Sequence, residues 1–179
     1  SNLNNLTQLD LRENQIIDIT ALSNLTNLNS LSLDDNQVSD VSPLAILTSL
    51  TSLSLSRNQI SDISPLSNLT NLNKLHLSYI QISDIGLLSN LTNLTYLHLD
   101  NTEIDDISTL SNLTNLASLY LRSNQITDIT PLIENTGISG KILLENNPLS
   151  NTALSTHIPA LEARGIIVSY DMPEGVVLF

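Results

Sequence analysis

Two histidines of the sequence have partners at spacings that could support chemistry. His76 and His98 are separated by one period of the repeat described below, and Asp100 lies just beyond His98. Imidazole and carboxylate groups are common ligands of zinc, so these three residues could hold a transition metal. Ser78, His98 and Asp100 could also form the serine, histidine and acid of a hydrolase. The alternative is that these residues have a purely structural or binding role, and the surrounding sequence indicates which of the three roles applies.

Neither chemistry has the support that it needs. Metal-binding histidines require neighbouring groups that orient their rings, and none is evident beside these two. A hydrolase requires oxyanion donors and an enclosed cleft, which an open sheet does not provide. The sequence also contains no cysteine and no glycine-rich phosphate-binding loop. We therefore predict that the protein is not an enzyme and that it holds neither a metal nor a cofactor.

The same stretch of sequence is better suited to binding a macromolecule. Exposed tyrosine and arginine side chains are frequent anchors of protein interfaces. Three of the four tyrosines and two of the three histidines fall on one predicted surface, and the earlier part of the chain carries mostly serine there. Chance filling of variable positions is the alternative explanation. The predicted partner-binding residues are Lys74, His76, Tyr79, Tyr96, His98, Asp100, Tyr120 and Arg122.

A short sequence repeat of constant length positions all of these side chains. The copy at residues 50–71 reads LTSLSLSRNQISDISPLSNLTN, and six copies follow one another without an insertion. They open at Leu6, Leu28, Leu50, Leu72, Leu94 and Leu116. A fixed period between about 20 and 50 residues indicates a solenoid.

The hydrophobic spacing changes halfway through each copy. Leu53 and Leu55 alternate with polar residues, which predicts a short strand with one buried face. From Ile60 and Ile63 onward, apolar residues recur at every third position, which indicates tight 3₁₀-like winding. No copy can bury its apolar side chains alone, so we expect stacked copies with a parallel sheet on the concave side and 3₁₀ or irregular turns on the convex side.

Two polar residues recur once per copy and are expected to bond backbone groups. The ninth position is Asn14, Asn36, Asn58 and Asn124 in four copies, and an asparagine amide can satisfy backbone groups where a strand turns. Ile80 and Thr102 interrupt this column, through repeat drift or through a distortion near a binding site. The acidic column is Asp18, Asp40, Asp62, Asp84, Asp106 and Asp128. Calcium needs six or more oxygen ligands, so we interpret these acids as acceptors for N–H groups of the following turns.

The unit L-x-x-L-x-L-x-x-N, continued by N-Q-I-x-D-I-x-P-L, resembles the leucine-rich repeats of bacterial internalins. The resemblance extends over nearly the whole chain. It implies a curved α/β solenoid that recognises a partner without enzymatic activity, but it implies no particular partner. It also implies a secreted or bacterial cell-surface protein, with a cytoplasmic scaffold as the alternative.

We expect three parts along the chain. Residues 1–149 contain a partial first repeat, six full repeats and one degenerate repeat, with one extra residue in the sixth copy near residues 134–140. Residues 150–170 are expected to form a C-terminal cap with a short amphipathic helix, a stop at Gly165 and a final strand. Residues 171–179 would be a tail or the stub of a linker. Because Ser1 lies inside a repeat, we expect a fragment with an uncapped N-terminal end.

The charge and hydropathy of the sequence limit its partners. Eighteen acids against six bases give a formal net charge of −12, which disfavours binding to nucleic acid. No apolar run approaches the length of about 18 residues that crosses a bilayer, so no membrane insertion is expected. We predict a protein partner. The alternatives are a glycan stacked on Tyr96 and Tyr120, or a structural spacer without a partner.

Overall fold

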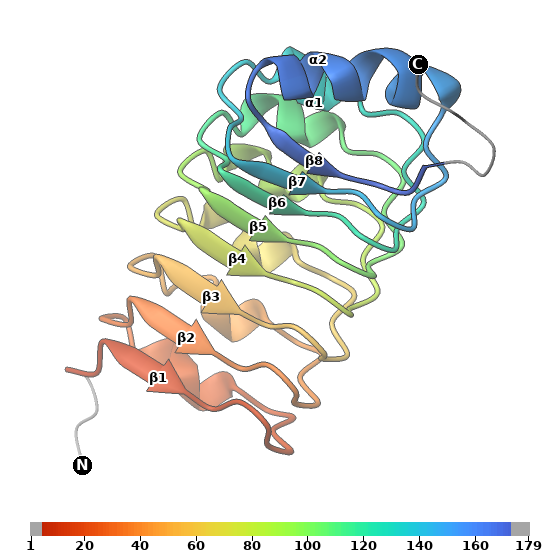
Figure 1. Ribbon diagram of the computed structural model, residues 1–179. Coiled ribbons are helices and arrows are strands. Elements are labelled where there is room, and N and C mark those ends of the chain that lie inside the picture. Colours follow the sequence, from red (N-terminus) through yellow and green to blue (C-terminus); the bar gives the residue numbers. More distant parts are fainter. Residues whose placement is uncertain (1–4, 173–179) are drawn as a thin grey trace.

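The computed structural model describes residues 5–172. The described chain coils into a curved solenoid with one open sheet, and successive strands lie side by side in chain order (Figure 1). All seven strand pairs are parallel, as predicted. The strands are β1 Gln8–Asp10, β2 Ser30–Ser32, β3 Ser52–Ser54, β4 Lys74–His76, β5 Tyr96–His98, β6 Ser118–Tyr120, β7 Lys141–Leu143 and β8 Ile167–Ser169.

The strand register places equivalent residues of successive copies next to one another. Leu53 pairs with Leu75, and Leu75 pairs with Leu97. Each strand ends one residue before the second leucine of the predicted pair. Lateral bonding still continues past the strand end, because the Leu55 N–H donates to the His76 carbonyl over 2.9 Å. Side chains at the same position of each copy therefore form straight columns across the sheet.

The side opposite the sheet is built from short, tightly wound turns, as the period of three predicted. These 3₁₀ segments are η1 Thr20–Asn24, η2 Ser42–Leu44, η3 Ser64–Asn68, η4 Gly86–Asn90 and η5 Ser108–Asn112. Each is preceded by an aspartate of the acidic column. Asp62 Oδ1, for example, accepts the Ser64 N–H over 2.8 Å, and this bond lowers the pKa of Asp62. The predicted structural role of the acidic column is confirmed.

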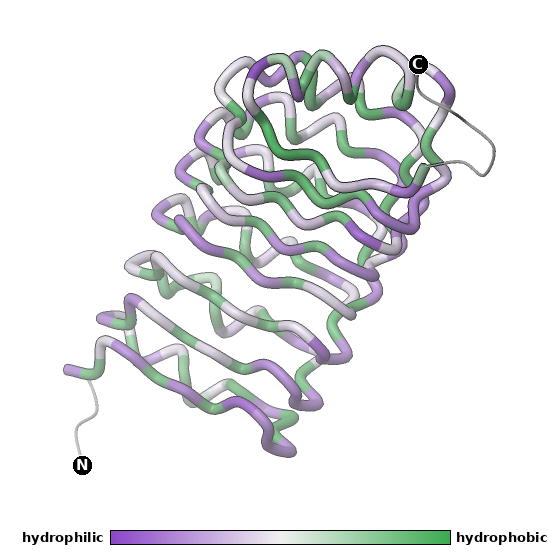
Figure 2. The backbone as a smooth tube through the Cα atoms, viewed as in Figure 1, coloured by the Kyte–Doolittle hydropathy of each residue, from purple (hydrophilic) through white to green (hydrophobic). Residues whose placement is uncertain are grey.

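A continuous stack of leucine and isoleucine fills the space between the sheet and the turns. Figure 2 shows hydrophobic segments recurring from coil to coil along the solenoid. Leu53, Leu75 and Leu97 are completely buried, as is Leu77 just after β4. The core is thin and is shared between neighbouring copies, so each copy depends on the next for burial.

The asparagine column runs along the edge of this core. Asn58 Nδ2 donates to the carbonyls of Leu33 and Leu55, each over 2.9 Å, and its Oδ1 accepts the Val38 N–H over 3.0 Å. Thr102 keeps part of the pattern, since its hydroxyl donates to the Leu99 carbonyl over 2.9 Å. Both observations confirm the role predicted for this position.

The predicted extra residue of the sixth copy is present. The strand register pairs Tyr96 with Ser118 and Ser118 with Lys141, and the second of these two steps along the sequence is one residue longer. The turn of this copy is the short α-helix α1, Thr130–Glu134, in place of a 3₁₀ segment. Asn135 is fully buried after α1, and its side chain donates to the Leu110 carbonyl over 2.7 Å.

A helix and a strand close the C-terminal end of the described chain, as predicted. The π-helical turn η6, Ala153–His157, leads into α2, Ile158–Ala163, with Pro159 in its first turn. Gly165 ends the helix with a positive φ of 81°, and β8 follows. In the residues that the structure describes, no helix combines the length and apolar character needed to span a membrane.

Candidate functional site

Four rings gather on the concave face of β4, β5 and β6. The strand register places His76, His98 and Tyr120 in one column and Tyr96 in the neighbouring column. The rings of His76 and Tyr96 stack with centroids 4.7 Å apart, and Tyr120 lies 4.8 Å from His98 and 5.1 Å from Tyr96. We call these four residues the aromatic cluster. Contacts of this kind hold each ring in one orientation before any partner arrives.

The aromatic cluster has two groups whose protonation is shifted by their surroundings. Burial and the charges of His98 and Lys74 lower the pKa of His76 against the opposing charge of Asp34, which favours the neutral ring. Burial and a hydrogen bond with Tyr120 raise the pKa of Tyr96 to about 12. Both groups therefore offer uncharged, polar-edged rings at neutral pH, which suits an interface that must be desolvated.

Asp100 lies beneath the aromatic cluster, where it supports other side chains. Its side chain is 6% exposed, and Oδ2 lies 2.9 Å from His98 Nε2. The guanidinium of Arg122 donates to the same oxygen over 2.7–2.8 Å. Burial alone would raise the pKa of Asp100, but these bonds hold it below its usual value. Of the predicted site residues, Asp100 is thus the one that positions neighbours instead of facing outward.

Tyr79 does not join the aromatic cluster. Its backbone has a positive φ of 57°, the residue is 48% exposed, and it lines a shallow hollow together with His76 and His98. The guanidinium carbon of Arg57 lies 4.4 Å from the centre of its ring. The sequence predicted Tyr79 as a neighbour of these residues but did not point to Arg57, which occupies the equivalent position one copy earlier.

A second residue was missed because the predicted site residues ended with the sixth copy. Lys141 Nζ lies 4.6 Å from the centre of the Tyr120 ring. The strand register places Lys141 in the same column as Lys74, Tyr96 and Ser118. One standard repeat length counted from Ser118 reaches Gly140, and the predicted extra residue shifts the count to Lys141, but the predicted partner-binding residues ended with the sixth copy.

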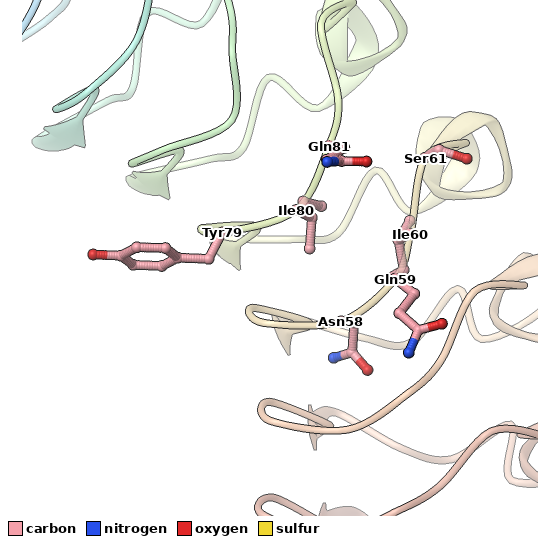
Figure 3. A pocket seen from close by; sticks show the side chains of 7 residues that line it. All are labelled: Asn58, Gln59, Ile60, Ser61, Tyr79, Ile80 and Gln81. Atoms are coloured by element: carbon pink, nitrogen blue, oxygen red, sulfur yellow. The ribbon is translucent and has the colours of Figure 1, made fainter.

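The interruption of the asparagine column at Ile80 coincides with a hollow beside Tyr79. Ile80 is 2% exposed and occupies the position of the asparagine column, but its side chain has no amide that could form hydrogen bonds. One copy earlier, the Val38 N–H donates to Asn58 Oδ1 and the Val38 carbonyl accepts the Gln59 N–H. Within residues 5–172, the equivalent bonds of the Ile60 N–H to a side chain and of the Gln81 N–H to the Ile60 carbonyl are both missing. The hollow has a volume of about 340 Å³ and is lined by the segments around Ile60 and Ile80 and by Tyr79. Figure 3 shows the Tyr79 ring pointing away from these two segments.

The described residues form neither the metal site nor the serine, histidine and acid of a hydrolase that the sequence suggested. Within the described residues, no group of three or more histidine, cysteine, aspartate or glutamate side chains could hold a metal ion. The Ser78 hydroxyl is buried and has no hydrogen-bond partner there, so it is not linked to His98. His98 and Asp100 are bonded to each other, and Arg122 takes the remaining capacity of the carboxylate.

The fold and the outward-facing side chains define a leucine-rich-repeat solenoid. A family profile described as leucine-rich repeats in two copies matches residues 4–46, 48–90, 70–112 and 92–134. The chain therefore belongs to the leucine-rich-repeat family, in its bacterial internalin-like form.

Solved structures of bacterial proteins share this fold. Internalin C2 of Listeria monocytogenes is 36% identical over 94% of this chain and 73% of its own, with a TM-score of 0.82. The internalin InlF of the same species is 34% identical over 88% of this chain and 54% of its own, with a TM-score of 0.69. A leucine-rich-repeat protein of Leptospira interrogans is 28% identical over 95% of this chain and 44% of its own, with a TM-score of 0.84. A comparison with curated proteins gives no match.

Proposed function

We propose that this chain is a non-enzymatic module that binds a protein through its concave sheet. The observation that carries the proposal is the aromatic cluster: four rings in mutual contact on three adjacent strands. Tyrosine offers a large contact area at a small entropic cost, so a rigid group of rings is a suitable anchor for a partner. The internalin-like fold supports the same class of function.

Removal of the two tyrosines tests this proposal. Wild-type protein and the Tyr96→Ala, Tyr120→Ala double variant would be used to capture proteins from the surroundings of the source organism, and each captured protein would then be titrated. Each tyrosine is expected to contribute about 2 kcal/mol or more to binding. The rings lie on the outer face of the sheet, so the midpoint of unfolding should change little. Full affinity of the double variant would place the binding site elsewhere.

Two serines of β2 provide a matched control. Ser30 and Ser32 occupy the same two columns as Tyr96 and the histidines, but outside the aromatic cluster. The Ser30→Ala, Ser32→Ala variant should bind as the wild type does. A wild type that bound immobilised glycans and no protein would instead favour the glycan-binding alternative.

We also propose that the protein acts at the bacterial surface or after secretion. The supporting observation is the likeness to internalins. The test is to detect the full-length gene product in separated cytoplasmic, surface and culture-medium fractions of the source organism. Recovery only in the cytoplasm would favour the scaffold alternative.

A further inference from the structure

We propose that the partner presents a short, extended acidic segment to this surface, with two carboxylates about four residues apart and an apolar or aromatic side chain between them. This inference rests on the proposed function and names the chemistry of the partner. It is carried by the distribution of unpaired positive charge around the aromatic cluster.

The three arginines near the concave face are each neutralised within the structure. Their ion pairs are Arg12–Asp10 at 2.7 Å, Arg57–Asp35 at 3.8 Å and Arg122–Asp100 at 2.7 Å. In the described part of the chain, Lys74 and Lys141 have no acidic partner within ion-pair distance. In a protein with a net charge of −12, two uncompensated ammonium groups therefore lie on the same face.

Both lysines belong to one column that crosses the aromatic cluster. Lys74 pairs with Tyr96, Tyr96 with Ser118, and Ser118 with Lys141. Neighbouring strands are about 4.8 Å apart, so the column separates the two lysines by about 14 Å. Lys141 also has its ammonium above the Tyr120 ring, which keeps the charge next to the cluster.

The distance between the two lysines determines the conformation and length of the segment that could bind both. An extended chain advances about 3.3–3.6 Å per residue, so about four residues bridge the two lysines. Alternate side chains of an extended chain point to the same side. Residues i and i+4 would then present carboxylates to Lys74 and Lys141. Residue i+2 would face the rings of Tyr96 and Tyr120, which favour an apolar or aromatic side chain.

The charge of the rest of the molecule limits the occupant to a short segment. A nucleic acid or another long polyanion would extend beyond the two lysines and meet the acidic surface of this chain. A short protein segment with two separated carboxylates needs to span only the column from Lys74 to Lys141, so electrostatic complementarity favours it over a long polyanion.

Random peptides displayed on phage provide the probe. Selection on the wild-type chain should enrich peptides with Asp or Glu at positions i and i+4 and an apolar residue between. A synthetic peptide made from the enriched pattern should lose at least about tenfold in affinity to each of the variants Lys74→Glu and Lys141→Glu. Selection on the Lys74→Glu, Lys141→Glu double variant should enrich peptides with Lys and Arg in place of the acids. Gln8→Glu adds negative charge to the same column outside the cluster and should leave the affinity unchanged.

The outcomes separate this inference from the proposed function. Peptides that depend on Tyr96 and Tyr120 but carry no excess of acids would overturn the acidic class and leave the concave binding site in place. Peptides that bind the double tyrosine variant as well as the wild type, or no enrichment at all, would overturn both. An affinity that is insensitive to Lys74→Glu and Lys141→Glu would overturn the assigned roles of the two lysines.

Discussion

At the scale of single residues, Asp100 shows how a buried charge can organise an exposed surface. Its carboxylate bonds both His98 and Arg122, which arise from neighbouring copies. A buried carboxylate is tolerated where charged hydrogen bonds compensate its lost hydration. The result is a fixed ring of His98 within the aromatic cluster. Asp100 therefore contributes to recognition through the side chains that it holds in place.

The pH dependence of stability should report this role. Because the folded pKa of Asp100 lies below its unfolded value, its contribution is present above about pH 4 and is lost as the pH falls through the folded pKa. We expect Asp100→Asn to reduce the free energy of unfolding at pH 7 by about 1.5–3 kcal/mol, the usual contribution of charged hydrogen bonds. Urea titrations at pH 7 and pH 3 would measure this, and an equal deficit at both values would contradict the assignment.

The asparagine column leads to a second prediction at this scale. Asn124 is 3% exposed, donates to the Leu99 and Leu121 carbonyls over 2.8 and 3.0 Å, and accepts the Ile104 N–H over 3.1 Å. Asn124→Ala leaves several buried backbone groups without partners, each costing about 1–3 kcal/mol, so a total loss above about 3 kcal/mol is expected in denaturant titrations.

The first member of the column is the natural control. Asn14 is exposed, so water can replace its two backbone bonds when it is changed to alanine. Asn14→Ala should therefore cost less than about 1 kcal/mol. Similar losses for the two variants would mean that the column contributes to stability by some route other than burial.

Many of these residue roles could be predicted from the sequence, because the same residue type recurs at the same position of several copies. Asp62 and Asn58 do what their columns indicated. The burial of Asp100 was not foreseeable, since most other copies leave the residue at that position at least partly exposed. Its burial goes together with its bonds to His98 and Arg122, which are specific to this copy. Lys141 was not predicted because the site residues were taken only from the six regular copies, and Lys141 lies one copy further on.

At the scale of elements, local spacing determined nearly everything except the sixth turn. Strands and 3₁₀ segments follow directly from apolar periods of two and three. Residues 130–134 carry a similar pattern, yet they form α1. In α1 the Asn135 N–H donates to the Pro131 carbonyl over 3.1 Å, which is the four-residue spacing of an α-turn. Such a choice depends on one hydrogen bond, which periodicity does not resolve.

Gly140 is the element-scale position most sensitive to substitution. It has a positive φ of 68°, and a Cβ placed there would lie 2.0 Å from the Ala117 carbonyl oxygen. Gly140→Ala therefore combines backbone strain with a clash against main chain and should lower stability by more than about 2 kcal/mol. Thermal unfolding would show a lower midpoint, and amide hydrogen exchange would show a local loss of protection around β7.

Gly86 is a suitable comparison within the same protein. It opens η4 where most other copies have serine or threonine, and its only close neighbour would be the Asp84 side chain. Gly86→Ser restores the residue found at most equivalent positions, so its midpoint of unfolding should stay near the wild-type value. A loss as large as that of Gly140→Ala would show that glycine content in general, and not the φ and the clash, determines the effect.

At the scale of the whole molecule, the solenoid is the feature that sequence predicts best and the partner is the feature that it predicts least. The contacts that define the fold lie within one copy or join adjacent copies, so a repeated pattern contains nearly all of the information. The binding surface depends on residues that vary between copies. Their convergence at β4, β5 and β6 could be predicted, but the contacts among their rings required the structure.

The one-dimensional arrangement predicts that identical substitutions have different effects along the chain. Leu77 is fully buried between copies on both sides, whereas Leu9 in β1 is only partly buried. Leu77→Ala should cost about 2–5 kcal/mol, as expected for a buried cavity, and Leu9→Ala clearly less. Leu3, at the predicted uncapped N-terminal end, lies outside the described residues.

Amide hydrogen exchange would show where each variant opens. A cavity at Leu77 weakens the interfaces of its copy with both neighbours, so exchange should accelerate across β3, β4 and β5 together. The Leu9→Ala variant should accelerate exchange only in β1 and β2, because the copies beyond them keep their own interfaces. Acceleration spread evenly over the whole sheet in both variants would mean that the molecule unfolds as a single cooperative unit, and the nearest-neighbour description would then be wrong.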